Sequence, residues 1–106
     1  MRGNPYEDVR YLTEYLLFHY GRPRDVCPIK WVPGKILQFH TRLRRECLLP
    51  LSTSPGSLRT TRGLDLGCGV GRFTFELGRV VSQSIGVDNS KSFVRAARKM
   101  RLTSYT

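Results

Sequence analysis

The chain has 106 residues, which is room for one small domain, and its 40% hydrophobic and 25% charged residues are ordinary for a globular protein. This composition excludes a disordered or low-complexity chain. The 18 Lys and Arg residues against 8 Asp and Glu give a net charge of +10, and residues 21–62 alone carry +7. Such a basic segment can meet nucleic acid or an anionic substrate, although its scattered charges favour a solvated surface.

The cysteines and histidines lack the spacing of metal ligands. No C-x-x-C pair is formed by Cys27, Cys47 and Cys68, and their number is odd. In the sequence, His19 and His40 do not have the short spacing of a metal-binding pair. Both observations argue against a metal site, and the first also argues against a disulfide framework. The longest apolar run, residues 16–18, is far too short to span a bilayer, and the N-terminus lacks a hydrophobic signal region. We therefore expect a cytoplasmic protein that has no membrane partner.

The first predicted element is a helix over residues 5–20. Asn4 can cap it, Pro5 suits the first helical position, and Glu7 completes a capping box. One buried stripe is expected from the spacing of Val9, Leu12, Leu16 and Tyr20. Gly21 is expected to end the helix.

A connecting segment rich in proline, residues 21–34, is followed by a second predicted helix over 35–48 that Leu49-Pro50 ends. Its apolar stripe is Ile36, Phe39, Leu43 and Cys47. We predict three regions: an N-terminal helical segment over 1–51, a polar linker over 52–62, and an α/β region over 63–106.

The α/β region shows a strand–helix–strand–helix pattern. Strands are predicted over 63–66 and 84–88, and helices over 71–80 and 90–101, the latter capped by Asn89 or Ser90. Phe73, Leu77 and Val80 lie on one face of the first of these helices. Such alternation is typical of a parallel sheet with helical crossovers.

The most informative stretch is Asp65-Leu66-Gly67-Cys68-Gly69-Val70-Gly71. An acid ends a strand, and three alternating glycines precede a helix, so the backbone can approach a ligand that a side chain would block. Asp88 closes the next strand, 23 residues later, where a carboxylate can accept both hydroxyl hydrogens of a ribose. Together these features indicate a nucleoside ligand across the ends of two adjacent strands.

The spacing and charge also bear on which nucleoside binds. Dinucleotide sites have G-x-G-x-x-G, whereas here the third glycine comes one place earlier and Arg72 stands at the expected position. Asp65 directly before the turn would repel a pyrophosphate but suits the ammonium group of a methionine moiety. Electrostatics therefore favour S-adenosylmethionine over NAD.

These two stretches resemble motif I and the following acidic strand of the class I methyltransferases, over about residues 62–101. The resemblance implies a Rossmann-like parallel sheet of seven strands, of which this chain would supply the N-terminal portion, with two strands. It implies that Gly67, Gly69 and Gly71 line the methionine end of S-adenosylmethionine, and that Asp65 holds its amino group. Asp88 would bind the ribose, with Asn89 beside it, and Cys68 would contribute its backbone.

A narrower resemblance concerns the N-terminus. Tyr6-Glu7, the stretch Glu14 to Gly21 and the stretch Gly71 to Leu77 resemble the 4-mercaptohistidine N1-methyltransferases of ovothiol synthesis. This implies a small-molecule acceptor, a thiolhistidine methylated on an imidazole nitrogen. Residues 27–50 and Gly69, where that family more often has Ala, depart from its pattern.

No residue is nominated as a catalytic base, because a neutral imidazole needs no strong base before attack. His19 and Tyr20 either face an acceptor or pack in the interior, and Arg72 is either a surface residue or a carboxylate partner. We expect the 106 residues alone to bind the cofactor weakly, without turnover. Two other functions stay open: an inactive interaction module, and a nucleic-acid binder or fragment of an RNA methyltransferase.

Overall fold

A computed structural model describes residues 3–34, 38–51, 58 and 60–103 of the chain. In chain order, the elements of its helical N-terminal half are a 3-10 turn η1 (Pro5–Glu7), α1 (Val9–Tyr20), α2 (Pro23–Val26) and α3 (Phe39–Leu43). The last continues as a π-helical turn η3 (Arg44–Leu48) and a 3-10 turn η4 (Leu49–Leu51). The second half contains β1 (Arg62–Leu66), α4 (Arg72–Leu77), β2 (Gln83–Val87) and α5 (Lys91–Leu102).

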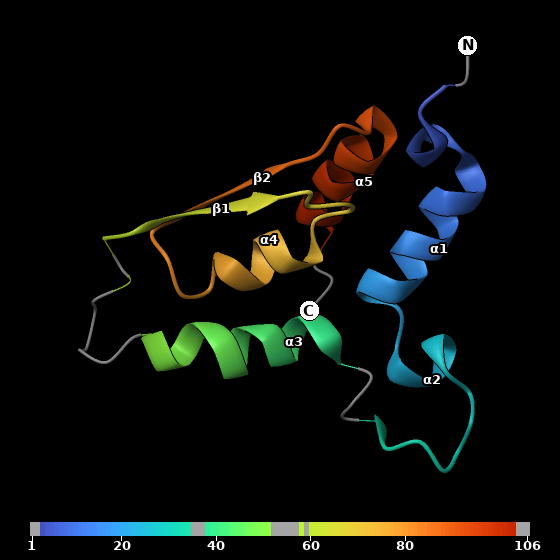
Figure 1. Ribbon diagram of the computed structural model, residues 1–106, viewed down its shortest axis with the longest axis horizontal. Helices are drawn as coiled ribbons and strands as arrows, with labels where there is room; N and C mark the ends of the chain where they lie inside the picture. The colour runs from blue at the N-terminus through green and yellow to red at the C-terminus, as the bar shows by residue number, and fades with distance from the viewer. Residues whose placement is uncertain (1–2, 35–37, 52–57, 59, 104–106) are drawn as a thin grey trace.

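The two strands form a parallel sheet, in register from Arg62 opposite Gln83 to Leu66 opposite Val87. Helix α4 lies against one face of the sheet, α3 runs alongside α4, and α1 stands across the carboxyl ends of both strands (Figure 1). This confirms the predicted strand–helix–strand–helix order and the parallel pairing. The helical segment and the two-stranded sheet fit the N-terminal portion of a Rossmann-like fold, with an incomplete sheet.

The two faces of this sheet differ in what covers them. On the α4 face, an added Cβ on Gly63 would lie 2.6 Å from the Leu77 side chain, so helix and strand are in close contact there. On the opposite face Leu64, Leu66, Ile85 and Val87 are all exposed, Leu66 by 75%. The described residues therefore bury one side of the sheet and leave an apolar surface on the other.

The first helix begins later than predicted. Asp8 has an extended backbone, with φ −69° and ψ 133°, and it separates η1 from α1. Asn4 caps η1 by accepting from the Tyr6 N–H, and Asp8 caps α1 by accepting from the Arg10 N–H. The predicted local capping box is wrong, because the Glu7 carboxylate binds the N-terminus of α5 instead.

The predicted buried stripe of α1 is also partly wrong. Val9 is 74% exposed. The side chains that turn away from solvent are half-buried and follow helical spacing: Leu12, Tyr15, Leu16, His19 and Tyr20. The half-buried face of α1 is therefore rotated toward Tyr15 and His19. The reason is that α1 packs on the glycine turn, where both side chains lie next to Gly69. The helix does end at Tyr20, as predicted.

The second predicted helix ends where expected. Its π-helical turn η3 ends at Leu48, directly before Leu49-Pro50, and a separate 3-10 turn η4 follows to Leu51. Cys47, predicted in the apolar stripe, is exposed, while Leu43 is half-buried as expected. Ile36 and most of the predicted linker, residues 52–57 and 59, lie outside the described residues.

The C-terminal elements agree closely with the prediction. Strand β2 ends directly before Asp88, and α5 is capped by the Ser90 hydroxyl, which accepts from the Phe93 N–H. Phe93 is buried, and Val94, Ala97 and Met100 are half-buried, as their helical spacing predicted. Strand β1 begins one residue early, at Arg62, and α4 ends early, at Leu77.

Candidate functional site

The turn between β1 and α4 contains three residues with a left-handed backbone. Gly67, Gly69 and Gly71 have φ values of 72°, 57° and 92°. Residues with a side chain rarely adopt this backbone conformation, which explains why glycine occupies these three alternate positions.

The three glycines face different surroundings. An added Cβ on Gly67 would meet nothing within 4 Å, so this position opens toward solvent. A Cβ on Gly69 would lie 3.2 Å from the His19 ring of α1, and one on Gly71 would lie 2.9 Å from the Cβ of Ala97 in α5. Gly67 therefore leaves room for a ligand, whereas the other two allow helices to pack closely.

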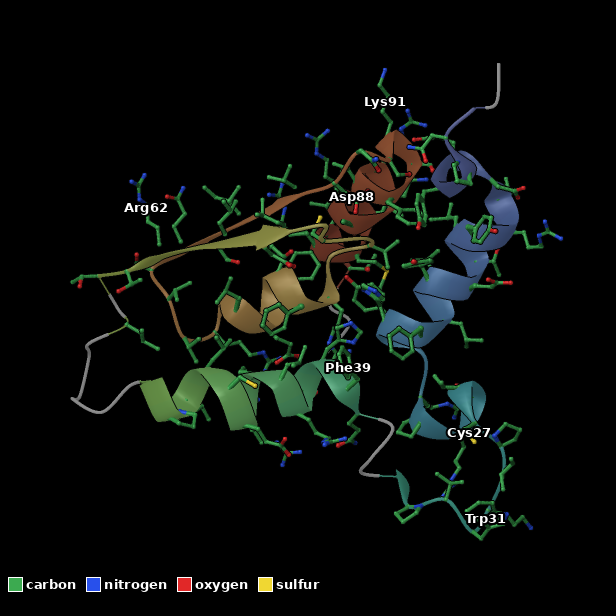
Figure 2. All side chains as sticks on the ribbon, viewed as in Figure 1. Cys27, Trp31, Phe39, Arg62, Asp88 and Lys91 are labelled. Carbon is green, nitrogen blue, oxygen red and sulfur yellow. The ribbon has the colours of Figure 1, made fainter. Side chains whose placement is uncertain are left out.

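The ends of both strands meet at a cavity of about 540 Å³, a volume typical of small-ligand pockets. Four of the residues predicted to bind the cofactor line it: Gly67, Gly69, Asp88 and Asn89. The remaining lining residues are Tyr6, Tyr15, Val87 and Phe93. Figure 2 shows Asp88 at the end of the sheet that faces α1, with Arg62 at the opposite end.

The Asp88 carboxylate is held in place by the backbone around it. Its Oδ2 accepts from the Gly69 N–H at 2.9 Å, and its Oδ1 accepts from the Ser90 N–H at 2.9 Å. The carboxylate therefore joins the glycine turn to the start of α5. Each oxygen keeps further acceptor capacity for a ligand hydroxyl.

The backbone donors of the glycine turn are mostly used inside the protein. The N–H groups of Gly67 and Cys68 both donate to the Val87 carbonyl, at 2.8 and 2.9 Å. Among the described residues lining the cavity, none is Lys or Arg. A pyrophosphate would meet no positive charge on these residues, whereas a cationic ligand would meet the Asp88 carboxylate.

Asp65 lies on the α4 side of the sheet rather than among the residues lining this cavity. Its Oδ2 accepts from the Thr74 hydroxyl at 2.8 Å. Burial raises the pKa of Asp65, and the charge of Asp88 adds to this, while the hydrogen bond from Thr74 opposes it. In this arrangement Asp65 ties β1 to α4.

Cys68 and Gly71 line a second cavity, of about 660 Å³, between α4, β2 and α5. The Cys68 thiol is buried, and burial raises its pKa, with Asp65 and Asp88 contributing. A thiol with a raised pKa is a poor nucleophile. Cys68 is therefore suited to packing behind the turn.

Three aromatic side chains of the cavity wall were missed from the sequence. Tyr6 and Tyr15 come from the N-terminal segment, and Phe93 from α5, with ring centroids of Tyr15 and Phe93 4.8 Å apart. Phe93 was recognised as apolar, but nothing in the spacing of Tyr6 and Tyr15 indicated a wall. The available signal was that both lie in the stretch resembling a methyltransferase N-terminus.

His19 and Tyr20 pack against the glycine turn. The Tyr20 hydroxyl donates to the Val70 carbonyl at 2.7 Å, and the Arg72 N–H donates to His19 Nδ1 at 3.4 Å. Neither residue lines the cavity. Of the two alternatives left open by the sequence, the structure supports packing.

Next to His19 and Tyr20, charged side chains cluster around a buried carboxylate, that of Glu76. Glu76, 2% exposed, accepts from Arg44 Nε at 2.7 Å and from Arg72 Nε at 3.1 Å, so Arg72 is a carboxylate partner. The His19 and His40 ring centroids are 4.3 Å apart. Desolvation, with the neighbouring histidine and Arg72, lowers the pKa of His19 to about 3, and desolvation with Arg72 lowers that of His40 to about 4, against a smaller opposing effect of Glu76.

Comparison with known proteins gives two matches. Residues 58–105 match a family model described as a methyltransferase domain. The 23S rRNA (uracil(1939)-C(5))-methyltransferase RlmD of Alkalilimnicola ehrlichii is 31% identical over 87 residues, which cover 78% of this chain and 19% of the relative. The chain thus spans about a fifth of that relative's length.

Both matches support a class I methyltransferase and imply S-adenosylmethionine as the methyl donor, and the family model places the domain in residues 58–105. Neither is to a thiolhistidine methyltransferase. In the described ranges, no helix is long and apolar enough to cross a membrane.

Proposed function

We propose that the cavity at the strand ends binds S-adenosylmethionine and that the protein transfers its methyl group to a thiolhistidine-type imidazole. The observation that carries the binding site is the Asp88 carboxylate, fixed by two backbone N–H groups beside a glycine turn that leaves open space at Gly67. The cofactor supplies a methyl group on a sulfonium, a good leaving group, so the protein mainly binds and orients.

Each wall of the cavity has a distinct task in this proposal. Asp88 accepts the ribose hydroxyls, with Asn89 next to it, and the backbone of Gly67 and Gly69 allows the cofactor to lie close to the turn. Tyr6, Tyr15 and Phe93 provide an apolar wall that excludes water. Aromatic faces also attract a cation such as a sulfonium.

The imidazole acceptor is supported by the N-terminal segment. Two of the stretches that resemble thiolhistidine methyltransferases, Tyr6-Glu7 and Glu14 to Gly21, lie largely in η1 and α1 and contribute Tyr6 and Tyr15 to the cavity. A neutral imidazole nitrogen carries its own lone pair, so attack needs no prior removal of a proton. This agrees with a cavity whose lining includes a carboxylate already engaged by backbone donors rather than a free base.

An RNA acceptor is the second candidate. It is supported by the name of the rRNA-methylating relative and by the charge of α5. This helix has no acidic residue, and five basic side chains are exposed: Lys91, Arg95, Arg98, Lys99 and Arg101. Within the described ranges none of the five forms an ion pair. A helix face of this kind suits a phosphate backbone.

Calorimetric titration of the purified protein with S-adenosylmethionine and S-adenosylhomocysteine tests the cofactor site. We expect saturable binding that Asp88→Ala abolishes and that Asp25→Ala leaves intact, because Asp25 is an exposed carboxylate paired with Arg22. Absence of binding by a folded protein would contradict the proposal and favour an interaction module.

The acceptor is tested by binding, because we expect the 106 residues alone to show no turnover. The protein is titrated with 4- and 5-thiolhistidine and with structured RNA in the presence of S-adenosylhomocysteine, and we expect saturable binding of a thiolhistidine. Binding of RNA instead, which weakens steeply as salt is added, would select the second candidate.

A further inference from the structure

The N-terminal turn η1 lies across the start of α5, more than 80 residues away in sequence. Glu7 makes the central contact: its carboxylate accepts from the Lys91 N–H at 2.5 Å and from the Ser92 N–H at 3.3 Å. Figure 2 shows Lys91 beside the N-terminal segment, above Asp88. A carboxylate here satisfies free donors of the first helical turn and interacts favourably with the helix dipole.

Three further hydrogen bonds join the same segments. The hydroxyls of Ser90 and Ser92 donate to the Tyr6 carbonyl at 2.8 and 3.4 Å, and the Asn4 side-chain amide donates to the Asn89 carbonyl at 3.3 Å. The Tyr6 ring also packs on Phe93, with centroids 5.9 Å apart. We call residues 4–7, together with their contacts to residues 89–92, the N-terminal clasp.

The N-terminal clasp holds the residues that fix Asp88. Ser90, whose hydroxyl is bound to Tyr6, also gives its N–H to Asp88 Oδ1. The following residues, Lys91 and Ser92, are held by Glu7. The position of the Asp88 carboxylate thus depends on a turn that residues from the N-terminus hold in place.

We infer that Glu7 is a positioning residue for the cofactor's ribose: it holds the turn after β2 so that Asp88 presents its carboxylate to the ribose hydroxyls. This inference rests on the proposed function. It gives the N-terminal segment a defined part in cofactor recognition, besides the aromatic wall it contributes through Tyr6 and Tyr15.

The charge of Glu7 suits this task. Desolvation raises its pKa, but the hydrogen bonds from Lys91, Ser92 and Ser90 together lower it, so the pKa falls below its ordinary value of 4.5. Glu7 is therefore ionised at neutral pH, when it binds the two N–H groups most strongly.

The test compares two ligands: S-adenosylhomocysteine and its analogue lacking the 2′ and 3′ hydroxyls. We expect Glu7→Ala to raise the Kd for S-adenosylhomocysteine roughly threefold to tenfold, the size expected for a misplaced hydrogen bond. The Kd for the analogue should be the same in both proteins, because it has no hydroxyls for Asp88 to bind. The matched control is Glu14→Ala, which removes an exposed acid of α1 and should change neither Kd.

A second variant guards against loss of structure. Glu7→Gln keeps a side-chain oxygen that can accept from an N–H, and it should show an intermediate Kd for S-adenosylhomocysteine. Hydrogen exchange at Lys91 and Ser92 should be fastest in Glu7→Ala and intermediate in Glu7→Gln.

Three results would overturn the inference, and they are distinguishable. Equal weakening of both ligands would mean that Glu7 acts only through general stability. An unchanged Kd in both variants would mean that Asp88 is positioned without Glu7. If the folded wild-type protein bound neither ligand, the cofactor site itself would fail, and the inference with it.

Discussion

The two ends of the N-terminal segment formed by η1 and α1 hold the second half of the chain by different chemistry. At the N-terminal end, an exposed carboxylate and three hydrogen bonds to backbone carbonyls join residues 4–7 to the start of α5. At the C-terminal end, His19 and Tyr20 pack on the glycine turn above a buried carboxylate with three arginine partners. The Arg72 guanidinium also lies 5.9 Å from the centroid of the Tyr20 ring.

The two ends should differ in their effects on the stability of the fold and on ligand affinity. Interactions removed from water contribute most to stability when satisfied and cost most when broken, so the C-terminal end should hold the fold together. The exposed N-terminal end contributes less to stability, but it lies next to Asp88. We therefore expect the C-terminal end of this segment to stabilise the fold and its N-terminal end to affect ligand binding.

The largest effect on stability is expected from Glu76→Ala. It leaves Arg44 and Arg72 without their shared carboxylate in a largely buried place, which should lower the free energy of unfolding by roughly 3 kcal/mol. Urea unfolding followed by circular dichroism measures this. The control is Glu46→Ala, which removes an exposed partner of Arg42 and should cost far less. Equal costs would contradict the contrast between the buried and exposed pairs.

Acid should weaken the C-terminal end first. The pKa values of His19 and His40 fall from 6.5 in the unfolded chain to about 3 and about 4 in the fold, so the unfolded state binds more protons between these limits. The free energy of unfolding should decrease as pH falls below 6.5 and continue to decrease toward pH 4. Thermal unfolding across this range measures the slope, and His40→Gln should flatten it. A slope unchanged in the variant would mean that other groups cause it.

A smaller effect is expected from Tyr20→Phe. The substitution removes only the hydroxyl that donates to the Val70 carbonyl, and it should cost about 1 kcal/mol. Chemical denaturation measures the change. Tyr11→Phe offers a matched control on the exposed part of the same helix, where we expect almost no change.

The smallest effect on stability is expected from Glu7→Gln. The group is exposed, so the thermal midpoint at pH 7 should stay close to that of the wild type while the affinity for S-adenosylhomocysteine falls. Since the pKa of Glu7 lies below 4.5, the clasp should persist until the pH falls through that lowered value. Amide exchange at Lys91 as a function of pH follows its opening. A large drop in the thermal midpoint of Glu7→Gln would mean that both ends of the N-terminal segment stabilise the fold, and it would contradict this contrast.

The sequence predicted the second half of the chain well because its signals are local. Glycine alternation, the strand ends at Asp65 and Asp88, and the Ser90 cap each depend on residues close in sequence. Four residues that the sequence predicted to bind the cofactor line one cavity in the structure: Gly67, Gly69, Asp88 and Asn89. The proposed binding roles of these residues stay predictions until a ligand is titrated.

The errors have a common physical cause. Asn4, Pro5 and Glu7 predicted one capped helix, but Asp8 is the better cap for α1, and Glu7 satisfies donors of a distant helix instead. Asp65 was assigned to the ligand from its charge, and that role stays a prediction; in the structure its Oδ2 accepts from the Thr74 hydroxyl. Local patterns show that a carboxylate can cap or bind, but not which of several available partners the fold brings to it.

The N-terminal clasp also has a consequence for folding on the ribosome. Its contacts join residues 84 to 86 positions apart, so they cannot form until almost the whole described chain has been made. At 5–20 residues per second this is a delay of roughly 4–17 s, during which the Tyr6 ring lacks its contact with Phe93 of α5. Contacts between such distant residues also close slowly. Residues 4–7 therefore reach their final positions only after the start of α5 has been made, long after they were synthesised themselves.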